Sequence, residues 1–143
     1  MATFIFFDEF GKNVSGAINL STDTFKAALT NTLPVQDTAD ELADITQIAA
    51  GFGYVAGGAT LTTVTYAETG AGTGIWKFSS DDVTFTASGG DIPAHQFLVL
   101  YSDTSIGDKL VGYVDRGSSA TISDGNSRTW DVGANGWFTL TIP

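Results

Sequence analysis

Residues 95–101 read His95-Gln-Phe-Leu-Val-Leu-Tyr101, a near-continuous apolar run. Such a run predicts a β-strand that is covered on both faces, in the centre of a sheet or at a subunit contact. Shortly before it, Val83, Phe85 and Ala87 alternate strictly with threonine, which predicts a strand with one buried face. This part of the chain is therefore expected to form a β-sheet.

Strand and turn signals continue on both sides of these segments. Further strands are predicted at 59–66, 74–78, 109–115, 121–122, 129–132 and 137–142, and turns rich in glycine or aspartate separate them at 70–74, 81–82, 116–117 and 124–126. Gly112 interrupts one predicted strand, which indicates a bulge or a close backbone approach. About eight short strands at this spacing predict an antiparallel β-sandwich. Its wiring could be jelly-roll or immunoglobulin-like, although the chain lacks the Cys…Trp…Cys spacing of a true immunoglobulin domain.

The N-terminal third has a different pattern. Phe4, Phe7 and Phe10 recur at helical spacing, which predicts a short amphipathic helix. We therefore expect residues 1–20 to be an N-terminal arm or short helix and residues 21–143 to be a single β-sandwich domain.

Two further elements are expected in this third. Residues 25–29 alternate like a strand. Thr38 and Glu41 have the spacing of a capping box, which predicts a short helix over about 42–49. The expected fold is thus mainly β, with one or two short helices near the N-terminus.

Composition excludes several classes of partner and site. The 143 residues suffice for one domain, and 6 basic against 16 acidic residues give a net charge of −10. This charge argues against a surface that follows nucleic-acid phosphates or binds anionic membranes. The chain has no cysteine, so disulfides, thiolate catalysis and zinc–thiolate sites are excluded. The apolar N-terminal stretch lacks a preceding basic residue and is not expected to be a secretory signal, and no apolar run approaches the ~20 residues of a membrane span.

Candidate catalytic residues are few, and we do not expect an enzyme. His95 is the only histidine, and without a nucleophile motif such as G-x-S-x-G it is interpreted as a packing or turn residue. Carboxylate pairs for glycoside hydrolysis could come from Asp81 with Asp82, from Asp103 with Asp108, or from Asp37 with Asp40 and Glu41. Aspartate in turns usually bonds its own backbone, so a structural role is favoured for all of them.

Two kinds of binding site compete with structural interpretations. The aspartate-rich loops 81–82, 103–108 and 124–126 could hold calcium, but a solvated acidic rim is favoured and no cofactor is expected. Trp76, Trp130 and Trp137 could form a face that stacks on sugars, but core or interface anchors are favoured.

Several segments together resemble a known family. They are 25–32 (FKAALTNT), 42–51 (LADITQIAAG) with 53–61 (GYVAGGATL), 82–90 (DVTFTASGG) with 97–104 (FLVLYSDT), and 110–119 (LVGYVDRGSS). In this order, from about residue 20 to the C-terminus, the chain is similar to small virion structural proteins of tailed bacteriophages.

The resemblance implies a structural function. Some of these proteins resemble head decoration (cement) proteins, which bind the outside of the capsid and stabilise it. It implies the major capsid protein as partner, a homo-oligomer with a trimer favoured, and a place on the capsid exterior of the virion. The alternative is a receptor- or carbohydrate-binding module of a tail or fibre.

The aromatic N-terminal segment is the candidate contact for such a partner. Phe4, Phe6, Phe7 and Phe10 make this segment more hydrophobic than a free terminus should be. They are expected either to be buried in a neighbouring subunit or the capsid shell, or to fold back on their own sandwich.

Overall fold

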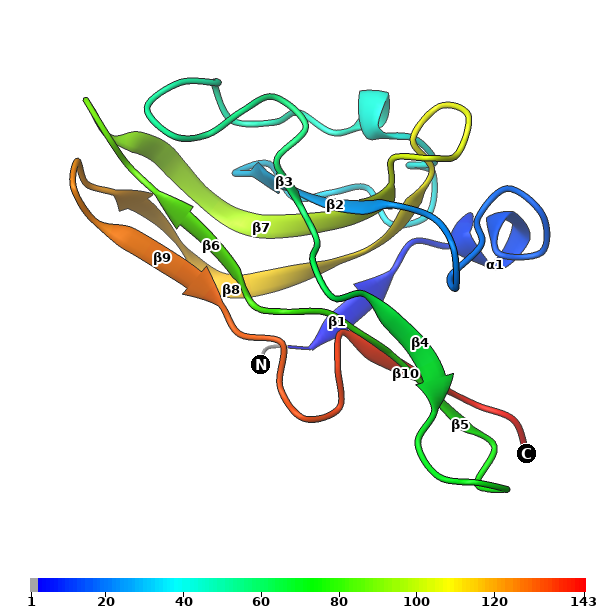
Figure 1. Cartoon of the computed structure of the whole chain (residues 1–143). Coiled ribbons are helices and arrows are strands. Elements are labelled where there is room, and N and C mark those ends of the chain that lie inside the picture. The colour runs from blue at the N-terminus through cyan, green and yellow to red at the C-terminus, as the bar shows by residue number, and fades with distance from the viewer. Residues whose placement is uncertain (1–2) are drawn as a thin grey trace.

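The computed structural model describes residues 3–143 and is mainly β, with antiparallel sheets whose arrangement is consistent with a β-sandwich (Figure 1). The elements are β1 (Phe4–Phe6), α1 (Phe10–Asn13), β2 (Phe25–Thr30), the 3₁₀ helix η1 (Leu42–Asp44), β3 (Ala59–Thr60), β4 (Thr65–Glu68), β5 (Ile75–Ser79), β6 (Val83–Thr86), β7 (Ile92–Ser102), β8 (Leu110–Ile122), β9 (Ser127–Trp130) and β10 (Phe138–Thr141). The strands form a five-stranded sheet in the order β1-β8-β7-β2-β3, a three-stranded sheet β10-β5-β4 and a ribbon β6-β9.

The five-stranded sheet has an apolar core on each face. Leu98 and Leu100 of β7 lie in the larger core, which the three-stranded sheet and the β6–β9 ribbon cover. Phe97, Val99 and Tyr101 lie in the second core, with Ala39 and Ile45 of the segment 31–50. We call this segment the strap. The prediction that 95–101 is a strand covered on both faces is therefore confirmed, because side chains that point to opposite faces of the sheet are both buried.

The N-terminal segment corrects the predicted helix. Residues 4–6 are a strand that pairs with β8, with Phe4 opposite Val114 and Phe6 opposite Gly112. The helix is the single turn Phe10–Asn13. The spacing of the phenylalanines fits a helix, but β1 and the residue after it present apolar side chains to both cores, as a strand covered on both faces requires.

Three other local predictions also change. The helix expected over 42–49 is only one 3₁₀ turn, and its cap is not Thr38, because the Asp44 carboxylate accepts the backbone N–H of Glu41 (3.0 Å). The strand expected at 59–66 is split into β3 and β4, with Thr63 in the left-handed region (φ 53°) between them. The turn expected at 116–117 is a bulge inside β8.

Candidate interaction surface

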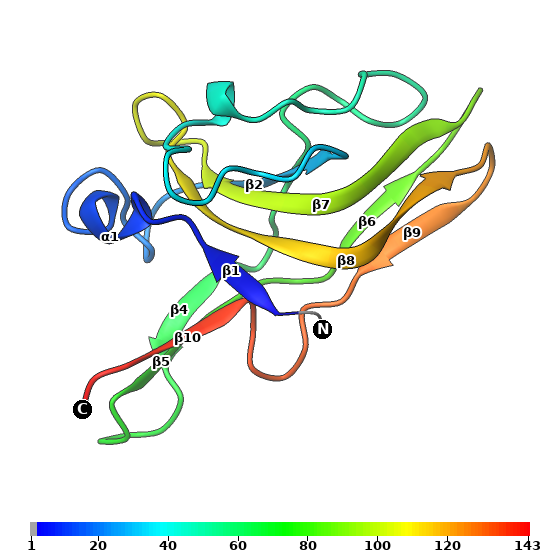
Figure 2. The same cartoon turned by 180° about the vertical axis from the view of Figure 1, so that it is seen from behind.

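The edges of the two larger sheets meet at a cluster of phenylalanines. Phe4 and Phe6 of β1 lie 5.2 and 4.9 Å, between ring centroids, from Phe138 of β10. Phe10 of α1 stacks on Phe6 at 5.3 Å. Figure 2 shows β1 beside β10 at this junction. Aromatic pairs at these separations add to the stabilisation from burial alone, so the N-terminal segment is fixed to the C-terminal strand.

The structure places the four predicted contact residues against the core of their own chain. Phe7 and Phe10 are buried, and Phe4 and Phe6 are half-buried and pack on the larger core. This is the fold-back alternative stated above. Contact of Phe4 and Phe6 with a partner stays a prediction, since their side chains keep part of their surface accessible.

An open groove lies next to this cluster. Its volume is about 510 Å³, and its lining consists of Phe6, Phe7, Asp8, Phe10, Gly11, Val14, Gln36 and Leu140. Most of these side chains are apolar, and only Asp8 carries a charge. The groove is thus suited to apolar side chains of another molecule rather than to a polar substrate.

Two loops beside α1 carry exposed apolar residues. Leu33 (61% exposed) and Val35 (58%) lie in the strap, and Ile106 (93%) lies in the loop between β7 and β8. Both loops lie at the α1 end of the molecule in the two opposite views (Figures 1 and 2). The backbone N–H of Asp8 donates to the carbonyl of Gln36 (3.1 Å), which joins the strap to the groove. We call the groove and these two loops the α1 surface.

The exposed residues of the α1 surface were not predicted from the sequence. An isoleucine inside the turn-rich segment 102–108 was the available signal, because a turn residue without a core to enter is expected to be exposed. Leu33 and Val35, on either side of Pro34, gave a similar signal.

His95 does not face a nucleophile. Its side chain is fully buried, and Nδ1 lies 2.9 Å from the carbonyl oxygen of Pro93. Burial lowers the pKa of this imidazole, which favours the neutral form. This burial agrees with the packing interpretation made from the sequence.

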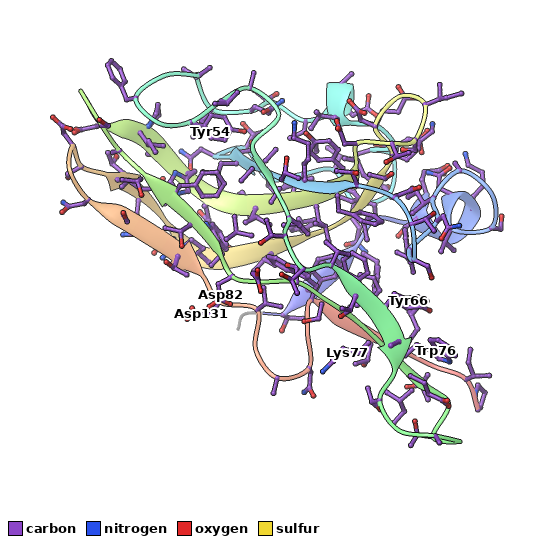
Figure 3. All side chains as sticks on the ribbon, in the orientation of Figure 1. Tyr54, Tyr66, Trp76, Lys77, Asp82 and Asp131 are labelled. Carbon is purple, nitrogen blue, oxygen red and sulfur yellow. The ribbon has the colours of Figure 1, made fainter. Side chains whose placement is uncertain are left out.

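Asp81 and Asp82, one of the predicted carboxylate pairs, bind different partners. Asp81 accepts the hydroxyls of Thr62 and Thr63, each at 2.8 Å, and these hydrogen bonds lower the pKa of its carboxyl. Asp82 instead accepts the backbone N–H of Val132 (2.8 Å). Asp82 and Asp131 lie near each other at a shallow hollow (Figure 3), but both are exposed. A glycosidase places one of its two carboxyl groups in a site shielded from water, and these two exposed side chains do not have that arrangement.

The other acidic residues are mostly engaged by donors of the protein. Asp40 and Glu41 pair with Lys109, and Asp124 accepts the backbone N–H of Gly89. Asp103 and Asp108 lie close enough to interact, because burial and then the charge of Asp103 raise the pKa of the Asp108 carboxyl. Across residues 3–143, no three histidine or carboxylate side chains group together in a way that could hold a metal ion. Among the described residues, none of the loops 81–82, 103–108 and 124–126 thus brings three such side chains together.

The three tryptophans separate into core and surface positions. Trp130 and Trp137 are buried, which confirms the core interpretation for both. Trp76 of β5 is half-buried and lies 5.6 Å from Tyr66 of β4, between ring centroids (Figure 3). This aromatic pair is the remaining candidate for stacking on a sugar.

Among residues 3–143 there is no helix of the length and apolarity that a membrane crossing would require. The chain matches no protein-family model, no curated protein and no solved structure.

Proposed function

We propose that this chain is a bacteriophage capsid decoration protein that binds the outer capsid shell and stabilises it through non-covalent contacts of the α1 surface. The observation that supports the proposal is the presence of an apolar groove and exposed apolar loop residues at one end of the molecule. Apolar surface of this kind, rimmed by polar residues, is typical of protein–protein contact sites. The resemblance of the segments described above supplies the capsid as the partner.

The proposal includes the assembly and the finer fold. The partner is the major capsid protein, the location is the capsid exterior, and the protein acts as a homo-oligomer, with a trimer favoured because three linked weak contacts give avidity. It acts without catalysis or a cofactor. Its sandwich belongs to the jelly-roll or immunoglobulin-like type, a choice supported by the antiparallel pairing of its strands.

Copy number in purified virions tests the proposal first. Quantitative mass spectrometry of gradient-banded particles, scaled to the major capsid protein, should give hundreds of copies per particle. A few to a few tens of copies would place the protein on the tail or a fibre and favour the alternative. Absence from the particle would contradict both functions.

A matched pair of variants then tests the α1 surface. Ile106→Asp places a carboxylate in the proposed contact and should weaken binding to heads that lack this protein at least tenfold, because the charge must lose its water. Val55→Asp adds the same negative charge at a site that is also exposed (70%) but lies in a different loop, and this variant should bind like the wild type. Equal binding by both variants would remove the α1 surface from the proposal.

The alternative, a receptor- or carbohydrate-binding module of a tail or fibre, rests on the Tyr66–Trp76 pair. It predicts binding on a glycan array that Trp76→Ala abolishes. Phe52→Ala is the matched control, because Phe52 is an exposed aromatic residue (54%) outside the three-stranded sheet. Array binding that both variants retain would contradict a role for this pair.

A further inference from the structure

Every buried side-chain nitrogen or oxygen that lacks a hydrogen-bond partner, among residues 3–143, lies around one tryptophan. These atoms are Nε2 of His95, an Nη of Arg116 and Nε1 of Trp130. The guanidinium carbon of Arg116 lies over the Trp130 ring, 4.8 Å from its centroid, and the His95 ring centroid is 6.5 Å from it. Buried polar atoms almost always have a partner, and a group without one indicates an ion or water that belongs there.

Two arginines lie near Trp130, and neither forms an ion pair with a carboxylate among the described residues. Arg116 and Arg128 are the only arginines of the chain, and their mutual repulsion, added to burial, lowers the pKa of the Arg116 guanidinium. Both arginines also lower the pKa of His95, after the larger effect of burial. The ion pairs among the described residues involve Lys12 and Lys109 and neither arginine. A partly buried arginine without a carboxylate is costly unless an anion neutralises it.

The strands direct these side chains toward one another. Arg128 and Trp130 are two residues apart on β9 and so share one face, and Trp130 belongs to the larger core. Arg116 comes from the bulge of β8, where residues 116–119 lie opposite the single residue Gln96 of β7. The Asp115 carboxylate fixes this bulge by accepting Gln96 Nε2 (2.9 Å) and the backbone N–H of Gly117 (2.7 Å). Bulges of this kind commonly re-aim a side chain at a site.

The hydrogen-bond donors and acceptors of these side chains limit the chemical class of the ligand. Arg116 and Trp130 supply N–H donors. The Pro93 carbonyl can only accept, so the hydrogen of the imidazole lies on Nδ1. Burial favours the neutral form of His95, in which Nε2 presents a lone pair that needs a donor. A carboxylate or sulfate would satisfy the two donors and leave Nε2 without a partner. An oxyanion that also carries a hydroxyl would satisfy all three.

We propose that His95, Arg116, Arg128 and Trp130 form a binding site for inorganic hydrogen phosphate, whose dianion still carries a hydroxyl at neutral pH. The phosphate oxygens accept from Arg116 and Trp130, and its P–O–H donates to His95 Nε2. The site lies at the β9 end of the molecule, away from α1 (Figure 1), and is independent of the proposed capsid contact.

An NMR titration of the uniformly ¹⁵N-labelled full chain tests the site at neutral pH. Inorganic phosphate should shift the Trp130 indole N–H resonance saturably and leave those of Trp76 and Trp137 in place. It should also raise Tm by about 4 °C at ten times Kd. Sodium sulfate and sodium chloride at matched ionic strength should bind at least tenfold more weakly. A phosphate monoester, titrated in parallel, is mostly a dianion without a P–O–H group at neutral pH, because its second pKa is about 6, and it should therefore bind more weakly than inorganic phosphate.

Matched variants separate the site from general charge effects. Arg116→Gln should weaken phosphate at least tenfold, whereas Lys26→Gln removes the same charge elsewhere and should not. If Arg116→Gln does not fold, Arg116→Lys keeps the charge and loses the planar fork, and should still weaken phosphate. Equal shifts with phosphate and sulfate, or no saturable shift of Trp130, would overturn the proposal and assign water to the three nitrogen atoms.

Discussion

Gly112 allows β1 to lie against β8. A Cβ atom at this position would lie 2.5 Å from the carbonyl oxygen of Ile5 and closer still to the Phe4 ring. Backbone cannot move away as a flexible side chain can, so the contact needs glycine. The close approach predicted from Gly112 inside a strand is thus confirmed, and its partner is a strand more than a hundred residues earlier in the chain.

Gly112→Ala should lower the free energy of unfolding by about 1–3 kcal/mol, because the added methyl group forces β1 away from its position. Urea denaturation measures this loss. Gly133→Ala is the control, since a Cβ there meets nothing within 4 Å, and it should unfold like the wild type. An unchanged midpoint for Gly112→Ala would show that β1 is not held as described.

The edge strand β3 pairs only with Lys26 and Ala27 of β2, and Tyr54 provides a hydrogen-bond partner for β2 further along the strand. Its hydroxyl accepts the backbone N–H of Leu29 (3.0 Å) and donates to Gln47 (2.7 Å). Burial raises the pKa of Tyr54 to about 12, against 10.0 for the unfolded chain. The unfolded state therefore loses its phenolic proton first, and this stabilisation is complete below pH 10 and is lost as pH rises toward 12.

Tyr54→Phe should make the fall of unfolding free energy between pH 10 and 12 shallower, by up to about 1.4 kcal/mol per pH unit. At pH 7 the same variant should lose about 1–3 kcal/mol, because the Leu29 N–H is left without a partner. Urea denaturation at several pH values measures both effects. Tyr66→Phe is the matched change at a half-buried site, and an equal loss at pH 7 there would contradict the special role of Tyr54.

At the scale of elements, ion pairs of Lys109 hold the strap (31–50) against the start of β8. Its ammonium pairs with Asp40 (2.6 Å) and Glu41 (2.9 Å). The backbone N–H of Leu42 donates to Asp108, and that of Leu110 donates to Asp40. The hydrogen bond from Lys109, followed by that from Asn13, lowers the pKa of Asp40, so this contribution is present above the usual carboxyl pKa and is lost as pH falls below it.

Lys109→Met should speed hydrogen exchange of the Leu42 and Leu110 amides, because two carboxylates are left beside each other without a cation. Exchange measured residue by residue by NMR tests this, and the Leu61 amide, which donates to Phe25 on the other edge of the sheet, is the internal control. Lys77→Met removes a charge from the three-stranded sheet and should leave the strap unchanged. Uniform acceleration at all three amides would indicate global destabilisation instead.

The elements show what the sequence could predict and what it could not. Strand patterns set by local alternation, such as 83–87, were predicted with their buried face. The alternation of buried and exposed side chains along β6 and the burial of Ala87 confirm this prediction. The N-terminal strand β1 was not predicted from the sequence, because its pairing with β8 depends on the space at Gly112. The bulge at 116–119 was mistaken for a turn, since Arg116-Gly117 has turn composition and only its partner strand shows that β8 continues.

At the scale of the whole molecule, the net negative charge destabilises the folded state. A net charge of −10 on 143 residues produces self-repulsion in the folded state. The composition also predicted a mainly β fold, and the structure confirms it. The candidate surface was predicted only in part, because exposure of Ile106 depends on how separate loops assemble.

Raising sodium chloride from 10 to 150 mM should raise Tm by a few degrees, because the Debye length shortens from about 30 to about 8 Å. Differential scanning calorimetry measures this shift. The double variant Asp8→Asn with Asp37→Asn removes two exposed charges and should gain less from salt. A fall in Tm with salt would mean that ion pairs such as Lys109–Asp40 outweigh the net repulsion.

The junction of β1 with β10 also sets an order of events during synthesis. Among the described strands, β1 leaves the ribosome first and β10 last, and Phe4 and Phe6 rest on Phe138. Until β10 emerges, the nascent chain carries an aromatic segment whose folded neighbour does not yet exist. Closure of this junction therefore waits for β10, and until then the N-terminal phenylalanines are a segment that a chaperone would meet.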